Sequence, residues 1–275
     1  MKVFSQDIGF TEGPVVCQDG AVAVTAIDRG QVAVSRGGAA RILAETGGGP
    51  NGLVEARDGY YVAQNGGAWP ATTRTAPGVQ RIEAGGRVDR LAGGMVAPND
   101  LAIGPDGLLY VTDPTRKPER DEGRIWTVDP ATGETRLFMT CDWYPNGIGF
   151  GPDPDWVHVA DTGGRRLVRV PREHPSEERL EVVFTMPHGL PDGFAFDADG
   201  RIVVAAVGAE EDEPGTVQVW SPDGRCEVLD PGGSRFITNV ALDAAGRLYV
   251  CDSGNNRLLV HDHGTPGLPL HPFRA

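Results

Sequence analysis

A polar residue, usually followed by glycine, opens a unit that recurs six times in this 275-residue chain. Each copy continues with an alternating apolar run, an Asp/Gly turn and a second apolar run, so each copy supplies a β-hairpin. The opening residues recur at intervals of 39, 48, 47, 46 and 47 residues, and they are Glu12, Asn51, Asn99, Asn146, Asp192 and Asn239. A period of about 40–50 residues filled with short strands is typical of a four-stranded propeller blade. The repeat therefore predicts an all-β, six-bladed β-propeller.

The rest of the chain is consistent with that architecture. The 39 glycines and 22 prolines separate regular apolar runs, which indicates many tight turns between strands. Strand-like runs between the hairpins, such as residues 124–129 and 217–220, are expected to form the outer strands of the blades. We expect the N-terminal Val3-Phe4 segment to close the ring by pairing with the last blade, because closure hides edge strands. All of residues 1–275 are assigned to one domain.

Charge and hydropathy exclude two classes of partner. The net charge is −13 and the basic residues are scattered, so no basic stripe is available to neutralise nucleic-acid phosphates. No run of 18 apolar residues is present, so no membrane span is predicted. The N-terminus has no apolar stretch of the kind found in a signal peptide. We therefore expect a cytoplasmic protein that acts on neither nucleic acid nor membrane.

The six opening residues are expected to face one central site, because equivalent positions of successive blades are related by rotation about the propeller axis. All six carry side-chain oxygen, and none is His or Cys. Such a set suits a hard divalent cation, Ca²⁺ above all, with Zn²⁺, Mn²⁺ or Mg²⁺ as alternative working metals. Asn-Gly and Asp-Gly are also common turn pairs, and turn capping would account for Asn51 and Asn239. Capping accounts poorly for Glu12, because Glu is a poor turn residue.

Four motifs carry a family resemblance: Glu12-Gly13-Pro14, Pro98-Asn99-Asp100, Pro145-Asn146-Gly147 and Pro191-Asp192-Gly193. In this order and spacing they resemble the senescence marker protein (regucalcin), gluconolactonase and luciferin-regenerating enzyme family. The resemblance implies a six-bladed propeller with one divalent metal in its central channel. It further implies that Glu12, Asn146 and Asp192 ligate the metal, that Asn99 reaches the metal or the substrate, and that Asp192 is the general base.

The resemblance predicts a metal-dependent hydrolase of the lactonase or esterase type. A metal acting as a Lewis acid would polarise the carbonyl of a small lactone or ester, and Asp192 would orient and deprotonate the attacking water. Because a cation lowers the pKa of a carboxylate bound to it, a metal-bound water is an alternative proton source. Asn51, Asn239 and Trp143 are predicted to contact the substrate together with Asn99 and Lys117.

Two positions depart from the sugar-lactonase pattern. Ala97 stands where such enzymes usually carry an Arg, and Lys117 falls near the place of a substrate-contacting Glu. These departures favour a less polar lactone or ester over an aldonolactone. Two other functions stay open. The final repeat, residues 243–257, resembles the NHL pattern of non-catalytic binding propellers, and the same metal site would also serve a lyase, isomerase or cyclase.

Overall fold

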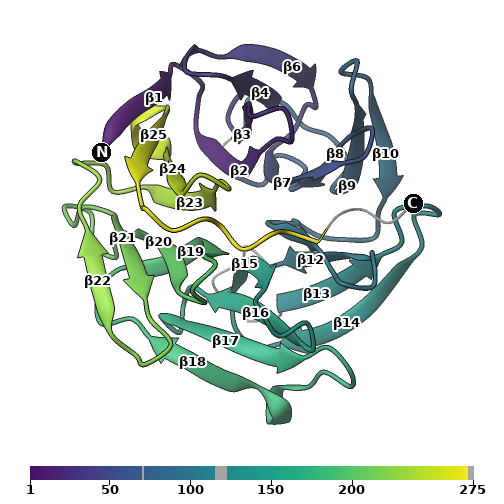
Figure 1. Cartoon of the computed structure of the whole chain (residues 1–275). Helices are drawn as coiled ribbons and strands as arrows, with labels where there is room; N and C mark the ends of the chain where they lie inside the picture. Colours follow the sequence, from purple (N-terminus) through teal and green to yellow (C-terminus); the bar gives the residue numbers. More distant parts are fainter. Residues whose placement is uncertain (70, 115–122, 272–275) are drawn as a thin grey trace.

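The computed structural model describes residues 1–69, 71–114 and 123–271 of the chain. Its strands form six sheets that stand around a common centre like the blades of a propeller (Figure 1), and the pairing is antiparallel except between β1 and β5. Within the described residues five sheets have four strands each, and the sixth has five. The prediction of an all-β, six-bladed propeller is confirmed.

The first three blades follow one another along the chain, and in each the first strand is innermost (Figure 1). Blade one consists of β2 (Thr11–Val16), β3 (Val22–Ala26), β4 (Gln31–Ser35) and β6 (Arg41–Glu45). Blade two consists of β7 (Pro50–Ala56), β8 (Gly59–Gln64), β9 (Gly78–Glu83) and β10 (Val88–Ala92). Blade three consists of β11 (Leu101–Ile103), β12 (Leu109–Asp113), β13 (Gly123–Val128) and β14 (Thr135–Cys141).

The last three blades repeat this order. Blade four consists of β15 (Pro145–Phe150), β16 (Trp156–Asp161), β17 (Arg166–Pro171) and β18 (Glu181–Thr185). Blade five consists of β19 (Leu190–Phe196), β20 (Ile202–Val207), β21 (Thr216–Trp220) and β22 (Cys226–Leu229). Blade six consists of β23 (Ile237–Leu242), β24 (Arg247–Asp252), β25 (Arg257–Asp262), β1 (Lys2–Gln6) and the short β5 (Gly38–Ala39).

In the part of the chain that the structure describes, helix is confined to two single turns, η1 (Glu177–Arg179) and η2 (Ser253–Asn255). Over the described ranges, no helix has both the length and the apolar character needed to cross a membrane.

The two ends of the chain meet in blade six, where β1 pairs antiparallel with β25. Val3 lies opposite Leu259 in this ladder, so the predicted closure through Val3-Phe4 is confirmed. Beyond β1, the short β5 of the blade-one segment adds in parallel at the edge, with Ser5 opposite Gly38. The last blade therefore takes its fourth strand from the first residues of the chain, and this pairing covers the edge of β25.

The hydrophobic core lies between neighbouring blades. Side chains on a strand alternate between its two faces, and each face packs against the next sheet. Tyr61 and Ala63 of β8, for example, share one buried cluster with Leu109 and Val111 of β12. Such packing fixes the angle between blades and therefore the position of every inner strand around the axis.

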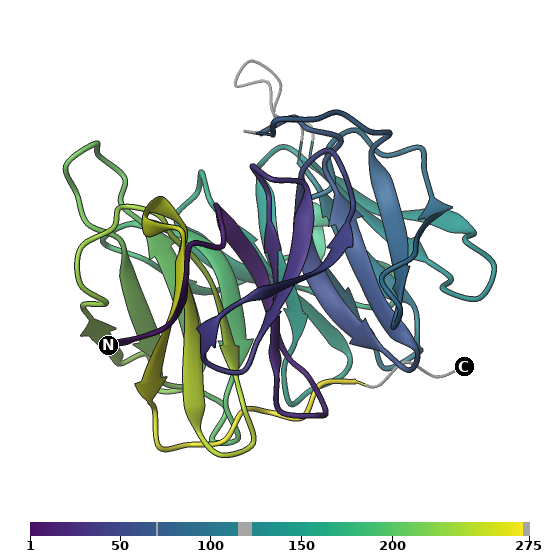
Figure 2. The ribbon, with the colours of Figure 1, turned by 90° about the horizontal axis from the view of Figure 1, so that it is seen from above.

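After β25 the chain crosses one end of the propeller axis as a C-terminal tail, here defined as residues 263–271 (Figures 1 and 2). The tail contacts blades six and five through backbone hydrogen bonds: Gly267 N donates to Asp243 O, Ala198 N to Pro266 O and Leu268 N to Phe196 O. These contacts lie at the far ends of the inner strands β19 and β23. The opening residues lie toward the other end of the axis, where the inner strands begin.

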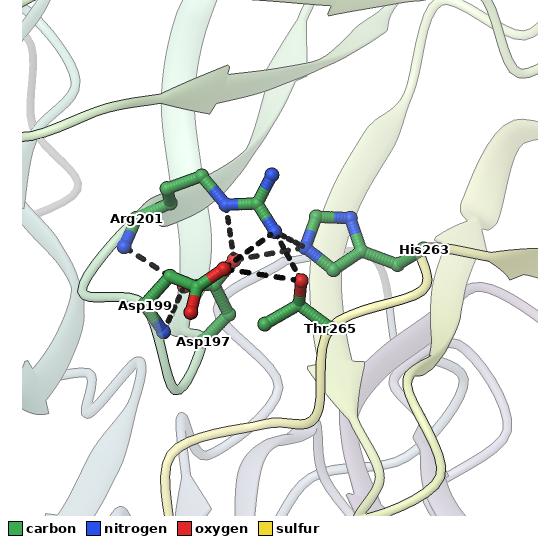
Figure 3. Close-up of polar contacts among 5 residues, drawn as sticks. All are labelled: Asp197, Asp199, Arg201, His263 and Thr265. Carbon is green, nitrogen blue, oxygen red and sulfur yellow. Dashed lines mark hydrogen bonds and ion pairs between the residues drawn. The ribbon is translucent and has the colours of Figure 1, made fainter.

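A buried carboxylate, Asp197, anchors the tail to blade five (Figure 3). Asp197 Oδ2 accepts a hydrogen bond from Arg201 Nε at 2.6 Å and lies 3.0 Å from His263 Nε2, while Arg201 Nη2 donates to Thr265 Oγ1 at 2.6 Å. Burial opposes ionisation of Asp197, but its hydrogen bonds from His263 and Arg201 outweigh burial and hold its pKa below the usual value. The cluster is internally paired, and we assign it to holding the tail in place.

A buried histidine makes the fold sensitive to acid. His158 on β16 is 6% exposed, packs edge-on against Phe196 and leaves Nδ1 without a hydrogen-bond partner. Burial, helped by the positive charge of Arg169, lowers the pKa of His158 to about 4. An unfolded histidine titrates near 6.5, so the unfolded chain binds more protons than the native one between these values, and stability falls as pH drops from about 6.5 to about 4.

We expect the variant His158→Leu to remove this part of the acid sensitivity. The wild type should lose up to about 3 kcal/mol more unfolding free energy than the variant between pH 7 and pH 4. Urea unfolding at both pH values measures the difference, and substitution of the exposed His188 by Leu is the control. Parallel pH profiles for wild type and His158→Leu would contradict the assignment.

Candidate functional site

The opening residues lie where the inner strands leave regular pairing. In five blades the ladder between the first two strands shifts register beside the opening residue: between Glu12 and Val15, Pro50 and Leu53, Pro145 and Ile148, Pro191 and Phe194, and Ile237 and Val240. In blade three the inner strand starts only at Leu101, after Asn99. Such bulges free residues from the ladder and redirect their side chains, which is why they occur beside functional sites.

Half of the ring is built where blades five, six, one and two meet. Asn239 Nδ2 donates to Glu12 Oε2 at 3.0 Å and joins blade six to blade one. A Cβ on Gly193 would lie 2.0 Å from Asn239 Oδ1, and a Cβ on Gly13 would lie 2.6 Å from Asn51 O. The opening residue of the next blade therefore occupies the space that a side chain at this glycine would fill. This close contact explains why a glycine follows the polar residue in these copies of the repeat.

The other half of the ring continues in the same way. Gly52 N donates to Asn99 O at 2.7 Å, and Thr112 Oγ1 donates to Asn146 O at 2.8 Å. A Cβ on Gly147 would lie 2.4 Å from Asp192 O. Contacts of this kind connect every neighbouring pair of blades, so the six opening residues form one closed ring around the axis. We call this set the ring residues.

The ring holds oxygen atoms that no protein donor satisfies. Five ring residues are buried, at 3–7% exposed, whereas Asp192 is half-buried. Asn51 Oδ1 and Asn146 Oδ1 are inaccessible and have no hydrogen-bond partner. A buried acceptor without a donor costs free energy unless a cation or ligand completes it.

The donor chemistry of the ring determines which metal fits. Over the described ranges, no three His, Cys, Asp or Glu side chains gather to hold an ion. A site here must therefore combine carboxylates with amide oxygens, a donor set suited to Ca²⁺. In such a site Glu12 and Asp192 would supply the negative charge, and the unsatisfied Asn146 Oδ1 would supply a neutral ligand. The ring residues therefore fit a Ca²⁺ ion.

A third acidic residue, Asp100, belongs to this site and was missed by the prediction. Burial raises the pKa of Asp100 to about 7, and the nearby negative charge of Glu12 contributes. Its Oδ1 accepts from Leu101 N at 2.8 Å, and a Cβ on Gly52 would lie 2.3 Å from the same oxygen. A signal for it was available, because Asp100 takes the place of the glycine that follows the opening residue in four blades.

Both ring carboxylates act on one buried thiol. Burial raises the pKa of the Cys251 thiol well above its usual value, and the negative charges of both Glu12 and Asp192 raise it further. The pKa of this thiol on β24 is therefore raised by the charges of both carboxylates. Together with Asp100 near Glu12, this arrangement concentrates negative charge at the centre of the propeller, and a bound cation would offset that charge.

Three other positions considered in the sequence analysis are Trp143, Ala97 and Lys117. Trp143 packs in the hydrophobic cluster between blades three and four with Ile125 and Phe150 and is only 8% exposed, which are the contacts of a core residue. Ala97 is buried, and its backbone N donates to Asp113 Oδ1 at 2.7 Å. Lys117 lies outside the described residues.

Comparison with known proteins identifies a matching family and several relatives that align with part of the chain. A family model described as the SMP-30/Gluconolactonase/LRE-like region matches residues 10–254. The gluconolactonase of Zymomonas mobilis is 26% identical over 188 residues, which cover 58% of this chain and 49% of that protein. Protein STRICTOSIDINE SYNTHASE-LIKE 4 of Arabidopsis thaliana is 29% identical over 118 residues, covering 39% of this chain and 31% of that protein. The chain thus spans less than half the length of these curated relatives.

Solved structures show the same fold. Regucalcin of Agrobacterium tumefaciens, described as a calcium-binding protein, superposes with a TM-score of 0.78 at 21% identity, and all of both chains is covered. At this identity the likeness establishes the six-bladed architecture alone. The family model, by contrast, extends from the start of blade one to the end of β24 and includes all six ring residues. The chain therefore belongs to the SMP-30/gluconolactonase/LRE-like family.

Proposed function

We propose that this protein is a divalent-metal-dependent hydrolase of the lactonase type. The observation that supports the proposal is the closed ring, which contains the buried, unsatisfied Asn146 Oδ1 and the two carboxylates of Glu12 and Asp192. A binding propeller without a metal would leave the buried oxygen of Asn146 unsatisfied.

Glu12, Asn146, Asp192 and Asn99 would hold the metal. Glu12 is fixed in place by hydrogen bonds to its Oε2 from Gly13 N and Asn239 Nδ2, both at 3.0 Å. Asn146 is oriented by its Nδ2, which donates to Thr162 Oγ1 at 3.1 Å and leaves Oδ1 as the available atom. Ca²⁺ is the proposed ion because every donor is oxygen. When bound, the ion would polarise the substrate carbonyl as a Lewis acid.

Asp192 is proposed as the general base. It is the one ring residue that is not buried, so it is the ring carboxylate more open to water. The carboxylate would orient the attacking water and take its proton as the water oxygen bonds to the acyl carbon. The acyl–oxygen bond of the lactone then breaks, and the departing alkoxide oxygen takes up a proton, which gives a hydroxy acid.

The names of relatives support a lactone as substrate class. The matched Zymomonas mobilis protein is a gluconolactonase, and a 6-deoxy-6-sulfogluconolactonase of Pseudomonas putida is 29% identical over 167 residues. We propose a small lactone or ester as substrate, with Asn51 and Asn239 contacting it from the ring.

A hydrolysis screen over lactones and esters tests this function. The purified protein is assayed as isolated, after removal of metal by a chelator, and after add-back of Ca²⁺, Mn²⁺, Zn²⁺ or Mg²⁺. We expect turnover of at least one lactone, loss of that turnover by at least tenfold on chelation, and recovery with one of the ions. Turnover that survives chelation unchanged would contradict the proposal. A protein that binds metal but hydrolyses no lactone or ester would favour a non-hydrolytic reaction at the same site.

A further inference from the structure

A further unsatisfied polar group, the side-chain amide of Asn65, lies on blade two, one residue beyond the end of β8. Asn65 N donates to Gly49 O at 2.9 Å, so the ladder with the inner chain of the blade continues to this residue. Tyr61 and Ala63 on the same strand face blade three, where they share a buried cluster with Leu101. Strand alternation therefore directs the Asn65 side chain to the same side, at the boundary of blades two and three.

The hydrogen bonds of Asn65 determine the orientation of its amide. Oδ1 accepts from Gly67 N at 2.8 Å and from Ala68 N at 3.0 Å, which holds the following turn. Nδ2 must then point the other way, and it is inaccessible and has no hydrogen-bond partner. Asn65 is only 2% exposed, so this donor is shielded from bulk water. A buried N–H without an acceptor is unfavourable unless a ligand supplies one.

The repeat places this donor beside the ring. Gln64 lies opposite Pro50 in blade two just as Asp161 lies opposite Pro145 in blade four, so Asn65 occupies the position of Thr162. In blade four that position contacts a ring residue directly, because Thr162 Oγ1 accepts from Asn146 Nδ2. By this equivalence Asn65 lies next to the ring residue of its own blade, Asn51.

The ring residue of blade two, Asn51, lacks a hydrogen-bond donor, whereas Asn65 lacks an acceptor. Asn51 Oδ1 is a buried acceptor without a donor, and Asn65 Nδ2 is a buried donor without an acceptor. A hydroxyl group both donates and accepts, so one hydroxyl can satisfy the two amides. Turn formation does not explain the choice of Asn, because it uses only Oδ1. In blade four the turn is held from one position earlier, by the Asp161 carboxylate, which accepts from Gly164 N.

We propose that Asn65 is a specificity residue, whose Nδ2 donates to a hydroxyl oxygen of the substrate while Asn51 Oδ1 accepts from the same group. This inference rests on the proposed lactonase function and deepens it. The substrate class is a lactone that carries a hydroxyl on the side of its ring nearest blades two and three. Asn65 positions this substrate and takes no part in bond breaking.

The variant Asn65→Asp tests the donor alone. The carboxylate keeps an acceptor for Gly67 N and Ala68 N but replaces the Nδ2 donor by oxygen. The probes are D-glucono-1,5-lactone, which carries hydroxyls, and δ-valerolactone, which has the same ring without them. We expect KM for the hydroxylated lactone to rise about 10–100-fold with kcat within threefold, because uniform binding is lost. KM for δ-valerolactone should change less than threefold.

Two further measurements separate the inference from folding and from the proposed function. Asn65→Ser, which adds no charge, should show the same selective rise, and thermal melting reports whether either variant is unfolded. Calorimetric titration with D-gluconate measures binding without turnover, and we expect both variants to bind at least tenfold more weakly than the wild type. Equal affinity of wild type and variants, an equal change in KM for both lactones, or no D-gluconate binding at all would overturn the role of Asn65. Absence of lactone turnover with D-gluconate binding still weakened in the variants would refute only the lactonase function.

Discussion

Replacing Glu12 by Gln is expected to reduce lactone turnover by roughly two orders of magnitude or more, because the ring loses a full negative charge at the proposed metal. Glutamine keeps the length of the side chain, so the effect isolates the charge. Turnover and bound metal should fall together. Asp192→Asn should cause a loss of similar size, since it removes both a ligand and the base.

A matched control for this prediction is available in the same blade. Glu45→Gln changes an exposed carboxylate on the outer strand β6. Among the side-chain hydrogen bonds of the described residues, this carboxylate accepts only from Gln31 Nε2. We expect full turnover and full metal content in Glu45→Gln. If Glu12→Gln and Asp192→Asn also kept both, the ring would have no catalytic role.

The second large effect is expected from the glycine that follows Glu12. Gly13 has a φ of +50°, and a Cβ there would lie 2.6 Å from Asn51 O and 2.7 Å from Leu53 N, both backbone atoms that cannot move independently of blade two. Gly13→Ala should therefore lower the unfolding free energy by about 3 kcal/mol or more and disturb the ring at the same time.

Gly20→Ala is the matched control for this substitution. Gly20 also has a positive φ, +81°, but a Cβ there would have no atom within 4 Å. We expect it to cost only about 1–2 kcal/mol, the strain of a left-handed backbone. Denaturant unfolding of both variants gives the comparison. Equal destabilisation would show that strain alone, and not contact between blades one and two, explains the glycine.

The period of the repeat was enough to predict the propeller and its closure. Both follow from a local pattern of short apolar runs and turns, and the pairing of Val3 with Leu259 is the one long-range contact that a closed ring requires. The C-terminal tail across the axis was not predicted. Its anchor joins Asp197 to His263, 66 residues apart, and no local pattern encodes such a contact.

The ring was predictable for the same reason, since equivalent positions must face one axis. Asp100 and Asn65 were not, because their roles depend on burial and on partners from other segments. Asp100 becomes notable through its proximity to Glu12, and Asn65 through a donor that the surrounding chain leaves unsatisfied. Trp143 illustrates the opposite case, in which an aromatic residue beside a site motif packs into the core between blades.

Calorimetric titration of the chelator-treated protein with Ca²⁺ tests the central claim most directly. A metal held by the ring predicts one site per chain in the wild type and in Glu45→Gln, with binding at least a hundredfold weaker or undetectable in Glu12→Gln. No saturable binding of Ca²⁺ or of the other divalent ions to the wild type, or equal binding to Glu12→Gln, would contradict a metal centre in this propeller.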